Sequence, residues 1–407
     1  MNQAAGLCSA SEAIVHRDAW EEILLDSVAK RGSGHTPDKK HPEYWGGSIK
    51  WLSLQDSARL DKLYIDDTAA TITAEGIKNS SAVIHPKGTV VLSRDAGIGK
   101  SAIMADNMAV SQHFMAWTCS PRLNNHFLYY WLQSKKSEFE RIANGNTIKT
   151  IGLPYFKELA IPLPKANEQR RIASALSDMD ALIASLKQLV AKKRDIQQAT
   201  MQQLLTGERR LPGFNGEWEV KTLGEVFFIS TGKSKSACIS AHGDHWIVDM
   251  GSVSTDGKLI VSKRTSLKAD FLNIGDLIMP KDDIGGGGII GRVGFIDAND
   301  TYVLGDHLYR LQARLGNPLF LSFVINGFPI NSALRRKVIG SAQLGLSRRS
   351  VEEQKISLPS LEEQAAIATL LSDMDTELAA LESRREKARL LKQGMMRELL
   401  TGRIRLV

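Results

Sequence analysis

The sequence predicts an α+β protein in which two globular domains alternate with two long helices that pair antiparallel as a coiled coil. Three observations lead to this prediction. One helical stretch occurs twice without gaps, from Glu168 to Leu211 and from Glu363 to Leu406. Both copies place apolar residues at alternating steps of four and three, which indicates a coiled-coil seam. The segments before them contain short strand-like runs separated by Gly, Asn, Asp and Ser.

The two helical copies predict the central architecture. Their seams consist of Ile172, Leu176, Met179, Ile183, Leu186 and Val190 in the first copy, and Ile367, Leu371, Met374, Leu378 and Leu381 in the second. Both seams turn polar and recover near Leu204 and Leu399, and each copy ends in Leu-Leu-Thr-Gly, with Gly207 and Gly402 as predicted stop residues. A helix of about 38 residues is about 57 Å long and needs a partner, for which the other copy is the nearest candidate.

The segment before the first helix is predicted to be rich in strands, with runs at 48–54, 89–93, 102–104 and 109–117. One helix is expected over Asn125–Ala143, where apolar residues recur at helical spacing. A proline-punctuated stretch from Leu153 to Pro164 then leads into the first long helix.

The segment before the second helix echoes the first. Trp218 corresponds to Trp20, Thr231-Gly232 to Ser33-Gly34, and 274–281 to 87–94. The chain therefore has an A-B-A′-B′ internal repeat, for which antiparallel helices imply pseudo-two-fold symmetry. The predicted parts are an unassigned extension (1–19), domain 1 (20–164), helix 1 (165–207), a connector (208–217), domain 2 (218–360), helix 2 (361–402) and a tail (403–407).

The strong likeness of the helices and the weak likeness of the domains allow two interpretations. The simpler one is a duplicated gene whose second half drifted. The functional one is that the helices bind a shared, duplicated partner, while the two domains each bind something different.

Composition restricts the class of protein. The chain has 407 residues, of which 43% are apolar and 24% charged, as in soluble globular proteins. Its net charge of +7 permits a nucleic-acid partner without requiring one. The N-terminus lacks the pattern of a signal peptide and the apolar runs are far short of a membrane span, so a cytoplasmic protein without a membrane partner is expected.

The sequence contains no convincing catalytic constellation. Gly97–Ser101 resembles the end of a phosphate-binding loop, but Arg94 stands where that motif needs glycine. A glycine-rich methyl-donor loop and an Asn-Pro-Pro-aromatic motif are both absent from the sequence. Asp249, Asp256 and Lys258 are better explained as surface residues than as a nuclease site, and His113 and His307, at matched positions without a fixed acid, are expected to pack. We therefore expect no catalytic residue, metal or cofactor in this chain.

Several motifs together resemble those of one family. They are the Glu-Gln opening with Leu-Ser-Asp-Met-Asp in both helices, the Leu-Leu-Thr-Gly endings, the connector from Arg209 to Trp218, and Ser33-Gly-His-Thr-Pro37 with 42–46 and 49–52. Over nearly its full length the chain resembles the specificity (S) subunit of type I restriction-modification enzymes. The unassigned extension before Trp20 has no match.

The resemblance implies a division of labour. Each domain would be a target recognition domain that reads one half of an asymmetric, bipartite sequence in double-stranded DNA. The paired helices would set the spacing and dock two methyltransferase (M) subunits, which use S-adenosylmethionine. Restriction (R) subunits that use ATP and Mg would join the complex. A rod of about 57 Å would hold the domains about one to one and a half DNA turns apart.

Base recognition in such domains needs directed donors and acceptors on loops, whereas phosphate binding needs only positive charge. The predicted DNA-binding residues are Ser33, His35, Thr36, Lys39, Lys40, Arg94, Lys100 and Lys149 in domain 1, and Lys233, Lys235, Lys281, Arg292, Arg348 and Arg349 in domain 2. Lys135, Lys136, Arg335, Arg336 and Lys337 are expected to contact phosphates or to be simple surface residues. Two other classes stay open: a methyltransferase with fused recognition domains, and a coiled-coil scaffold that binds only protein.

Overall fold

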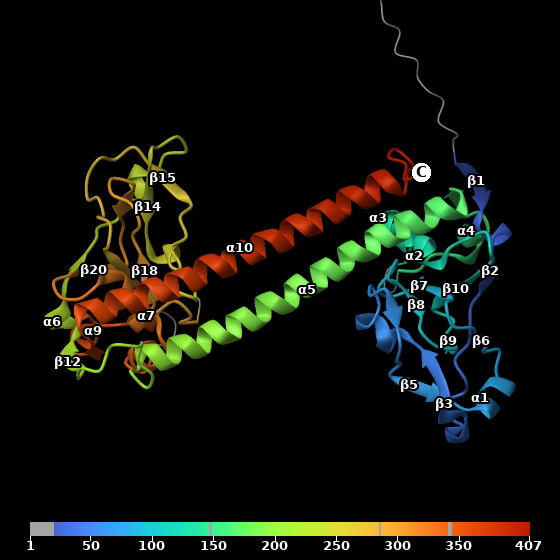
Figure 1. Cartoon of the computed structure of the whole chain (residues 1–407), viewed down its shortest axis with the longest axis horizontal. Coiled ribbons are helices and arrows are strands. Elements are labelled where there is room, and N and C mark those ends of the chain that lie inside the picture. The colour runs from blue at the N-terminus through green and yellow to red at the C-terminus, as the bar shows by residue number, and fades with distance from the viewer. Residues whose placement is uncertain (1–19, 146–148, 285, 341–343) are drawn as a thin grey trace, which may run out of the picture. The chain divides into compact units, whose positions relative to one another are not determined.

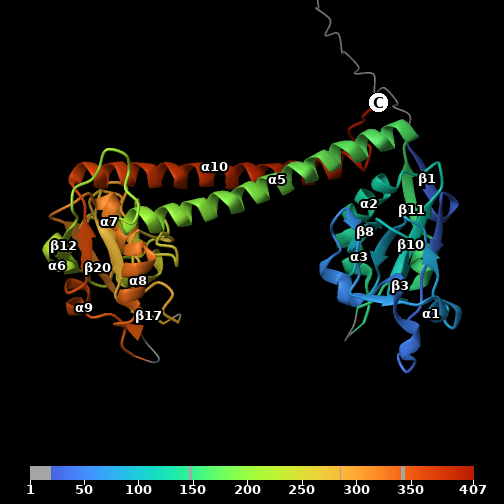
Figure 2. The same cartoon turned by 60° about the horizontal axis from the view of Figure 1, so that its bottom comes forward.

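The computed structural model describes residues 20–145, 149–284, 286–340 and 344–407, so the N-terminal extension lies outside the described residues. The chain forms two compact units, Met1–Leu186 with Arg384–Val407, and Lys187–Ser383. Each unit contains one globular domain together with one half of helix α5 and the opposite half of helix α10 (Figures 1 and 2).

Domain 1 is built on a five-stranded sheet of order β2-β10-β7-β8-β4, a four-stranded sheet of order β5-β3-β9-β6, and the pair β1-β11. Its elements are β1 (Glu21–Leu24), β2 (Ala29–Gly32), β3 (Trp45–Leu52), β4 (Tyr64–Ile65), β5 (Ala70–Ile72), α1 (Ala74–Lys78), β6 (Ile84–His85), β7 (Val90–Ser93), β8 (Ser101–Met104), β9 (Met108–Val110), β10 (Phe114–Cys119), α2 (Asn125–Ser134), α3 (Lys136–Ile142), α4 (Leu153–Lys157) and β11 (Ala160–Leu163). The strands β7 and β8 are buried throughout because sheet and helices cover both of their faces.

Domain 2 repeats this plan with sheets of order β13-β20-β16-β18 and β15-β14-β19, and with the pairs β12-β22 and β17-β21. Its elements are β12 (Glu219–Thr222), α6 (Leu223–Val226), β13 (Phe227–Thr231), β14 (His245–Val248), β15 (Lys263–Thr265), β16 (Leu277–Pro280), β17 (Asp282–Asp283), β18 (Gly294–Phe295), β19 (Tyr302–Leu304), β20 (Leu308–Ala313), α7 (Pro318–Asn326), α8 (Phe328–Arg335), β21 (Leu344–Gly345), α9 (Arg348–Glu352) and β22 (Lys355–Leu358). The parallel pair β14-β19 corresponds to β3-β9, which confirms the predicted internal repeat.

Two expected elements of domain 1 are divided in the structure. The helix expected over Asn125–Ala143 breaks at Lys135 into α2 and α3, and domain 2 has the same break at Gly327 between α7 and α8. The run 109–117 is two strands, because a turn closed by the Phe114 N–H and the Ser111 carbonyl (3.2 Å) separates β9 from β10. Apolar periodicity does not detect either break because buried apolar residues continue beyond it, Leu132 and Phe139 around Lys135 and Val110 and Phe114 around the turn.

The two long helices are α5 (Ala166–Leu205) and α10 (Leu361–Leu399). Gly207 and Gly402 follow their last turns with left-handed φ angles of 73° and 72°, which confirms both as helix stops. Within each unit the helix halves run antiparallel, as the contacts of Asp180 with Lys392 and of Lys193 with Glu377 show. In each contact the lysine, Lys392 or Lys193, lies where the predicted seam of its helix has lost its apolar residues.

The apolar ends of the helices belong to the domain cores rather than to a helix–helix seam alone. Ile172 and Leu176 are fully buried in a cluster that contains α2 of domain 1 and Leu399 of α10. Ile367 and Leu371 occupy the corresponding cluster of domain 2 with Leu204. Each such side chain stabilises the unit by roughly 1.5–3 kcal/mol through burial. Farther along, Leu186 and Val190 are buried, whereas Met179, Ile183, Met374, Leu378 and Leu381 are half-buried.

The Glu-Gln pair that opens each helix has the same structural task in both units. Gln169 donates to the Pro164 carbonyl (2.8 Å) and accepts from the Asn124 N–H (2.7 Å). Gln364 repeats both bonds, to the Pro359 carbonyl and from the Asn317 N–H, each at 2.8 Å. The glutamines therefore fix the start of each helix to the N-cap of α2 or α7.

The glutamates form a second repeated contact, which we call the latch. Glu168 accepts two hydrogen bonds from Arg405 of the tail, at 2.7 and 2.8 Å, and one from the Trp20 indole at 3.3 Å. Glu363 accepts two from Arg210 of the connector, both at 2.5 Å. Each latch thus joins the segment that follows one helix to the first turn of the other helix, where a carboxylate is also favoured by the helix dipole.

Candidate nucleic-acid interface

Two of the predicted DNA-binding residues, Arg94 and Lys281, occupy equivalent positions in the two domains. Arg94 directly follows β7, and Lys281 directly follows β16. The Arg94 N–H donates to the His113 carbonyl (3.0 Å), and the Lys281 N–H donates to the His307 carbonyl (3.0 Å). Each domain therefore places one basic residue against the turn that precedes its β10 or β20 strand.

An aspartate follows each basic residue and binds the histidine of that turn. The His113 Nδ1 atom lies 2.5 Å from Asp95 Oδ2, and the His307 Nδ1 atom lies 2.7 Å from Asp282 Oδ2. The prediction that these histidines lack an acid and simply pack is wrong. The side chains are 32% and 46% exposed, and the acids escaped notice because they precede the histidines by 18 residues in one domain and 25 in the other.

A third segment completes the arrangement in both domains. The Ile151 N–H donates to the Arg94 carbonyl (3.0 Å), and the Leu346 N–H donates to the Lys281 carbonyl (2.8 Å). Thr150 also donates its hydroxyl to Asp95. We call the whole the Asp–His ribbon, made of Arg94, Asp95, His113, Asn144, Lys149 and Thr150 in domain 1 and of Lys281, Asp282, His307, Ile339, Leu344 and Gly345 in domain 2.

The predicted loop around Ser33 lies beside the ribbon of domain 1. Ser33 donates its hydroxyl to the Phe114 carbonyl (2.7 Å), and Thr36 donates to the side chain of Gln112 (2.7 Å). Gly34 is required here, because a Cβ atom would lie 1.7 Å from the Val110 carbonyl oxygen. Gly232 repeats this approach in domain 2, where a Cβ would lie 1.9 Å from the Gly305 carbonyl oxygen. Both loops are therefore set against the ribbon turn by a glycine.

The other exposed candidates surround these features. His35 is exposed next to Thr36, and Lys39 and Lys40 are exposed on the following turn. Lys149 and Lys233 are exposed as well. Arg348 and Arg349 on α9 are 54% and 86% exposed and pair with Glu352 and Glu353 at 2.7 Å. Such exposed pairs contribute little to stability, so both arginines can exchange their partner for a phosphate.

Two candidates in domain 2 make contacts inside the protein. The Lys235 side chain is only 9% exposed and its Nζ atom lies 2.5 Å from Asp270. Arg292 donates to the Asn326 carbonyl (2.5 Å), and burial lowers the pKa of its guanidinium. Both side chains therefore bind groups of their own domain.

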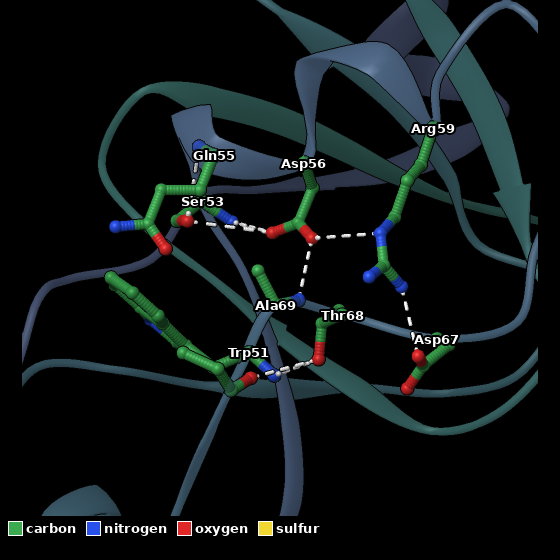
Figure 3. Close-up of polar contacts among 9 residues, drawn as sticks. Trp51, Ser53, Gln55, Asp56, Arg59, Asp67, Thr68 and Ala69 are labelled. Carbon is green, nitrogen blue, oxygen red and sulfur yellow. Dashed lines mark hydrogen bonds and ion pairs between the residues drawn. The ribbon is translucent and has the colours of Figure 1, made fainter.

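Lys100 of domain 1 is likewise bound inside the protein, by a loop that follows β3. Figure 3 shows the polar contacts that build this loop. Asp56 is fully buried and accepts from the backbone N–H groups of Ser53 (2.9 Å) and Ala69 (2.6 Å) (Figure 3). The loop so fixed presents Ser57, whose carbonyl and hydroxyl accept from Lys100 Nζ at 3.1 and 3.2 Å. Lys100 is therefore a structural residue whose charge still contributes to the local potential.

A basic cleft of about 530 Å³ lies next to the domain 1 ribbon, lined by Ala96, Gly97, Ile98, Lys100, Lys136, Glu140 and Lys149. Three lysines face one glutamate, although Lys136 also pairs with Asp61 at 2.6 Å. The balance of charge makes the cleft a candidate contact for a DNA phosphate.

The described part of the chain contains no group of three or more His, Cys, Asp or Glu side chains arranged to hold a metal ion. A search of the same residues for a helix long and apolar enough to span a bilayer also finds none.

The fold thus defines a protein with two domains of one design, each with a partly exposed Asp–His ribbon that carries a basic residue beside its aspartate. The family model of the type I restriction modification DNA specificity domain matches residues 17–192 and 215–392, and the chain belongs to this family. This match confirms the predicted family and its class of function, DNA recognition within a restriction-modification system rather than catalysis. The structure confirms the predicted α+β fold with two long helices.

Individual relatives agree with the family match. The MjaIX specificity subunit of Methanocaldococcus jannaschii is 30% identical over 233 residues, about half of either chain (53% of each). The MjaVIII specificity subunit of the same organism is 24% identical over 95% of this chain and 93% of its own. Among solved structures, the S subunit from M. genitalium has a TM-score of 0.61 at 18% identity, covering 95% of this chain and 97% of its own. The HsdS subunit from Thermoanaerobacter tengcongensis has a TM-score of 0.51 at 17% identity, covering 95% and 98%.

Sequence reasoning missed Asp95, Asp282, Thr150, Asn144 and Ile339. A signal for the aspartates was present, because the matched segments 87–94 and 274–281 are both followed by Asp. Thr150, Asn144 and Ile339 gave no such signal, since their position near these aspartates depends on tertiary structure alone.

Proposed function

We propose that this chain is the sequence-specific DNA-recognition subunit of a type I restriction-modification complex, and that each domain reads one half of an asymmetric bipartite target. The observation that carries the proposal is the Asp–His ribbon, which recurs on one backbone plan in both domains with different side chains around it. A common scaffold with different surface groups is expected when two domains dock on DNA alike but read different bases.

A domain exchange tests this proposal. Residues 20–160 are replaced by the equivalent segment of another specificity subunit, and methylated sites are mapped in cells that carry the chimera with its methyltransferase. One half of the methylated sequence should change and the other should stay. A change in both halves, or in neither, would contradict the assignment of one half-site to each domain.

We further propose that two methyltransferase subunits dock on the helices, one in each unit. Ile196 on α5 and Leu391 on α10 are equivalent residues of the helical repeat, and both are large, apolar and exposed, at 43% and 58%. A repeated apolar surface position suits two copies of one protein partner. In native mass spectrometry, Ile196→Asp or Leu391→Asp alone should reduce the complex from two methyltransferase subunits to one. Retention of both subunits in the double variant would contradict these anchor positions.

The remaining proposals concern spacing and the larger complex. The helices act as a ruler, so inserting a few residues near Leu204–Thr206 should lengthen the gap between half-sites in the methylated sequence, and an unchanged gap would count against it. S-adenosylmethionine binds in the methyltransferase subunits, ATP and Mg act in restriction subunits, and the complex is cytoplasmic. This assignment of cofactors to subunits is checked by copurifying the complex from a lysate. Methyl transfer and ATP hydrolysis are then measured with and without the methyltransferase and restriction subunits.

A further inference from the structure

The two ribbons differ at their outermost position. In domain 1, Asn144 forms a bridge with Thr150, whose hydroxyl donates to Asp95. In domain 2, Ile339 forms the corresponding bridge with Gly345, which pairs with Asp282. Asn144 and Ile339 therefore occupy equivalent positions. Each is bridged to the residue, Thr150 or Gly345, that contacts or pairs with the aspartate of its ribbon.

Pairing across these strands puts the side chains on one face. Residues directly opposite each other in an antiparallel pair point to the same side and lie about 5 Å apart. Asn144, Thr150 and Asp95 thus form one row, and Ile339, Gly345 and Asp282 form the other. A row of three positions spans about 10 Å, close to three base-pair steps of about 3.4 Å, and a β-ribbon of this width fits the DNA major groove.

Both outer residues are free to meet a ligand. Ile339 is 74% exposed, and Gly345 offers it no side chain to pack against. Asn144 is also exposed, and within the described ranges its carboxamide makes no hydrogen bond. Lys149 next to Thr150, and Lys281 next to Asp282, give each ribbon one lysine adjacent to its row. An exposed isoleucine, and an exposed amide without a hydrogen bond among the described residues, suit the edges of bases, and the one lysine of each ribbon suits a phosphate.

We propose that Asn144 and Ile339 are specificity-determining residues at equivalent positions of the two domains. Asn144 pairs its carboxamide with N6 and N7 of an adenine in the half-site read by domain 1. Ile339 packs against the C5-methyl group of a thymine in the half-site read by domain 2. These are the base edges that an amide and an apolar side chain recognise in the major groove. The proposal rests on the proposed function and assigns one base of each half-site.

The test maps the methylated sequence in a host without other DNA methylation, using the full chain with its methyltransferase. Asn144→Ala should relax one base in the half-site of domain 1, and Ile339→Ala should relax one base in the half-site of domain 2, by on the order of 5- to 150-fold in preference. Ile339→Asn should shift the preferred base from thymine to adenine. Asn79→Ala and Ile260→Ala, at exposed positions outside the ribbons, are matched controls and should leave the sequence unchanged.

The outcomes separate the two levels of inference. If Asn144→Ala and Ile339→Ala methylate the unchanged sequence, or lose efficiency uniformly at all sites, the assignment of these residues is wrong while the proposed function stands. If the unmodified chain directs no sequence-specific methylation, the proposed function itself fails. Should a variant give no methylation, selection of binding sequences from a random oligonucleotide pool by the purified complex measures the base preference directly, with the same two outcomes.

Discussion

The latch of the first unit gives the sharpest prediction, because its partner in the second unit is a built-in control. The Glu168 side chain is 3% exposed and that of Arg405 is 13% exposed. Glu168→Gln removes the charge from both bonds to Arg405. Removing one partner of a buried ion pair costs about 3–5 kcal/mol. Because Arg405 regains some contact with water, we expect the lower end, about 3 kcal/mol.

Hydrogen exchange measures this change where it occurs. The Ile404 N–H donates to the Glu398 carbonyl (3.2 Å), just beyond α10, and the Arg209 N–H donates to the Gln203 carbonyl (3.1 Å) at the equivalent place beyond α5. A loss of about 3 kcal/mol in local stability makes exchange about 150-fold faster. In Glu168→Gln we expect that increase at Ile404 and none at Arg209.

Glu363→Gln should show the reverse pattern with a smaller effect, about 2 kcal/mol or roughly 30-fold. Arg210 is more exposed than Arg405, at 24%, and the Trp218 indole finds no acceptor among the described residues, whereas the Trp20 indole donates to Glu168. Equal acceleration of both amides in either variant would indicate general destabilisation, and no acceleration in either would show that the latches contribute nothing. Both results would refute the reasoning.

Three further predictions follow from the same contacts. Hydrogen bonding from Arg405 lowers the pKa of Glu168 below its usual 4.5. The ionised Glu168 side chain therefore contributes its full stability above pH 4.5, and this contribution is lost as the pH falls through the lowered pKa. The urea unfolding midpoints of the wild type and of Glu168→Gln should converge in acid and keep a constant gap from about pH 6 to 8. Asp56→Ala leaves two backbone N–H groups without their acceptor and should destabilise domain 1 by about 2–4 kcal/mol in urea unfolding. Asp67→Ala, at an exposed ion pair, should leave the unfolding midpoint little changed, and equal effects of the two substitutions would contradict the role of Asp56. Asp95→Ala removes the partner of the Thr150 and His113 side chains. Binding of the assembled complex to a cognate DNA duplex, measured by fluorescence anisotropy, should weaken about tenfold, while methyltransferase binding stays unchanged as the control. Unchanged DNA affinity would show that the ribbon does not contact DNA.

The repeated helices were predictable because their signals are local and periodic. Apolar residues at steps of four and three specify a helix face, and Gly207 and Gly402 supply the left-handed residues that end each helix. The duplication of those signals also gave the domain plan, since two matching helices imply two matching preceding segments. The family motifs lie in the same local features, so they could be recognised without coordinates.

The partners of the helix ends were only partly predictable. The spacing of Ile172 and Leu176 shows that one face is buried, but it does not say whether a second helix or a globular domain covers that face. In the structure both contribute to one cluster. The glutamates of the Glu-Gln motif likewise bind arginines that lie far away in sequence, so their role emerged only from the fold.

The sequence by itself determined the architecture, the repeat and the family of this protein, because each rests on residue patterns within a single segment. Only the tertiary structure decided which residues form the candidate DNA interface. It joined Asp95 to His113 and Thr150, and Asp282 to His307, across different spacings, and it turned Lys235 and Arg292 inward. A charged residue in a loop carries no mark of the direction in which it points. That direction is set by neighbours that the chain brings together only when it folds.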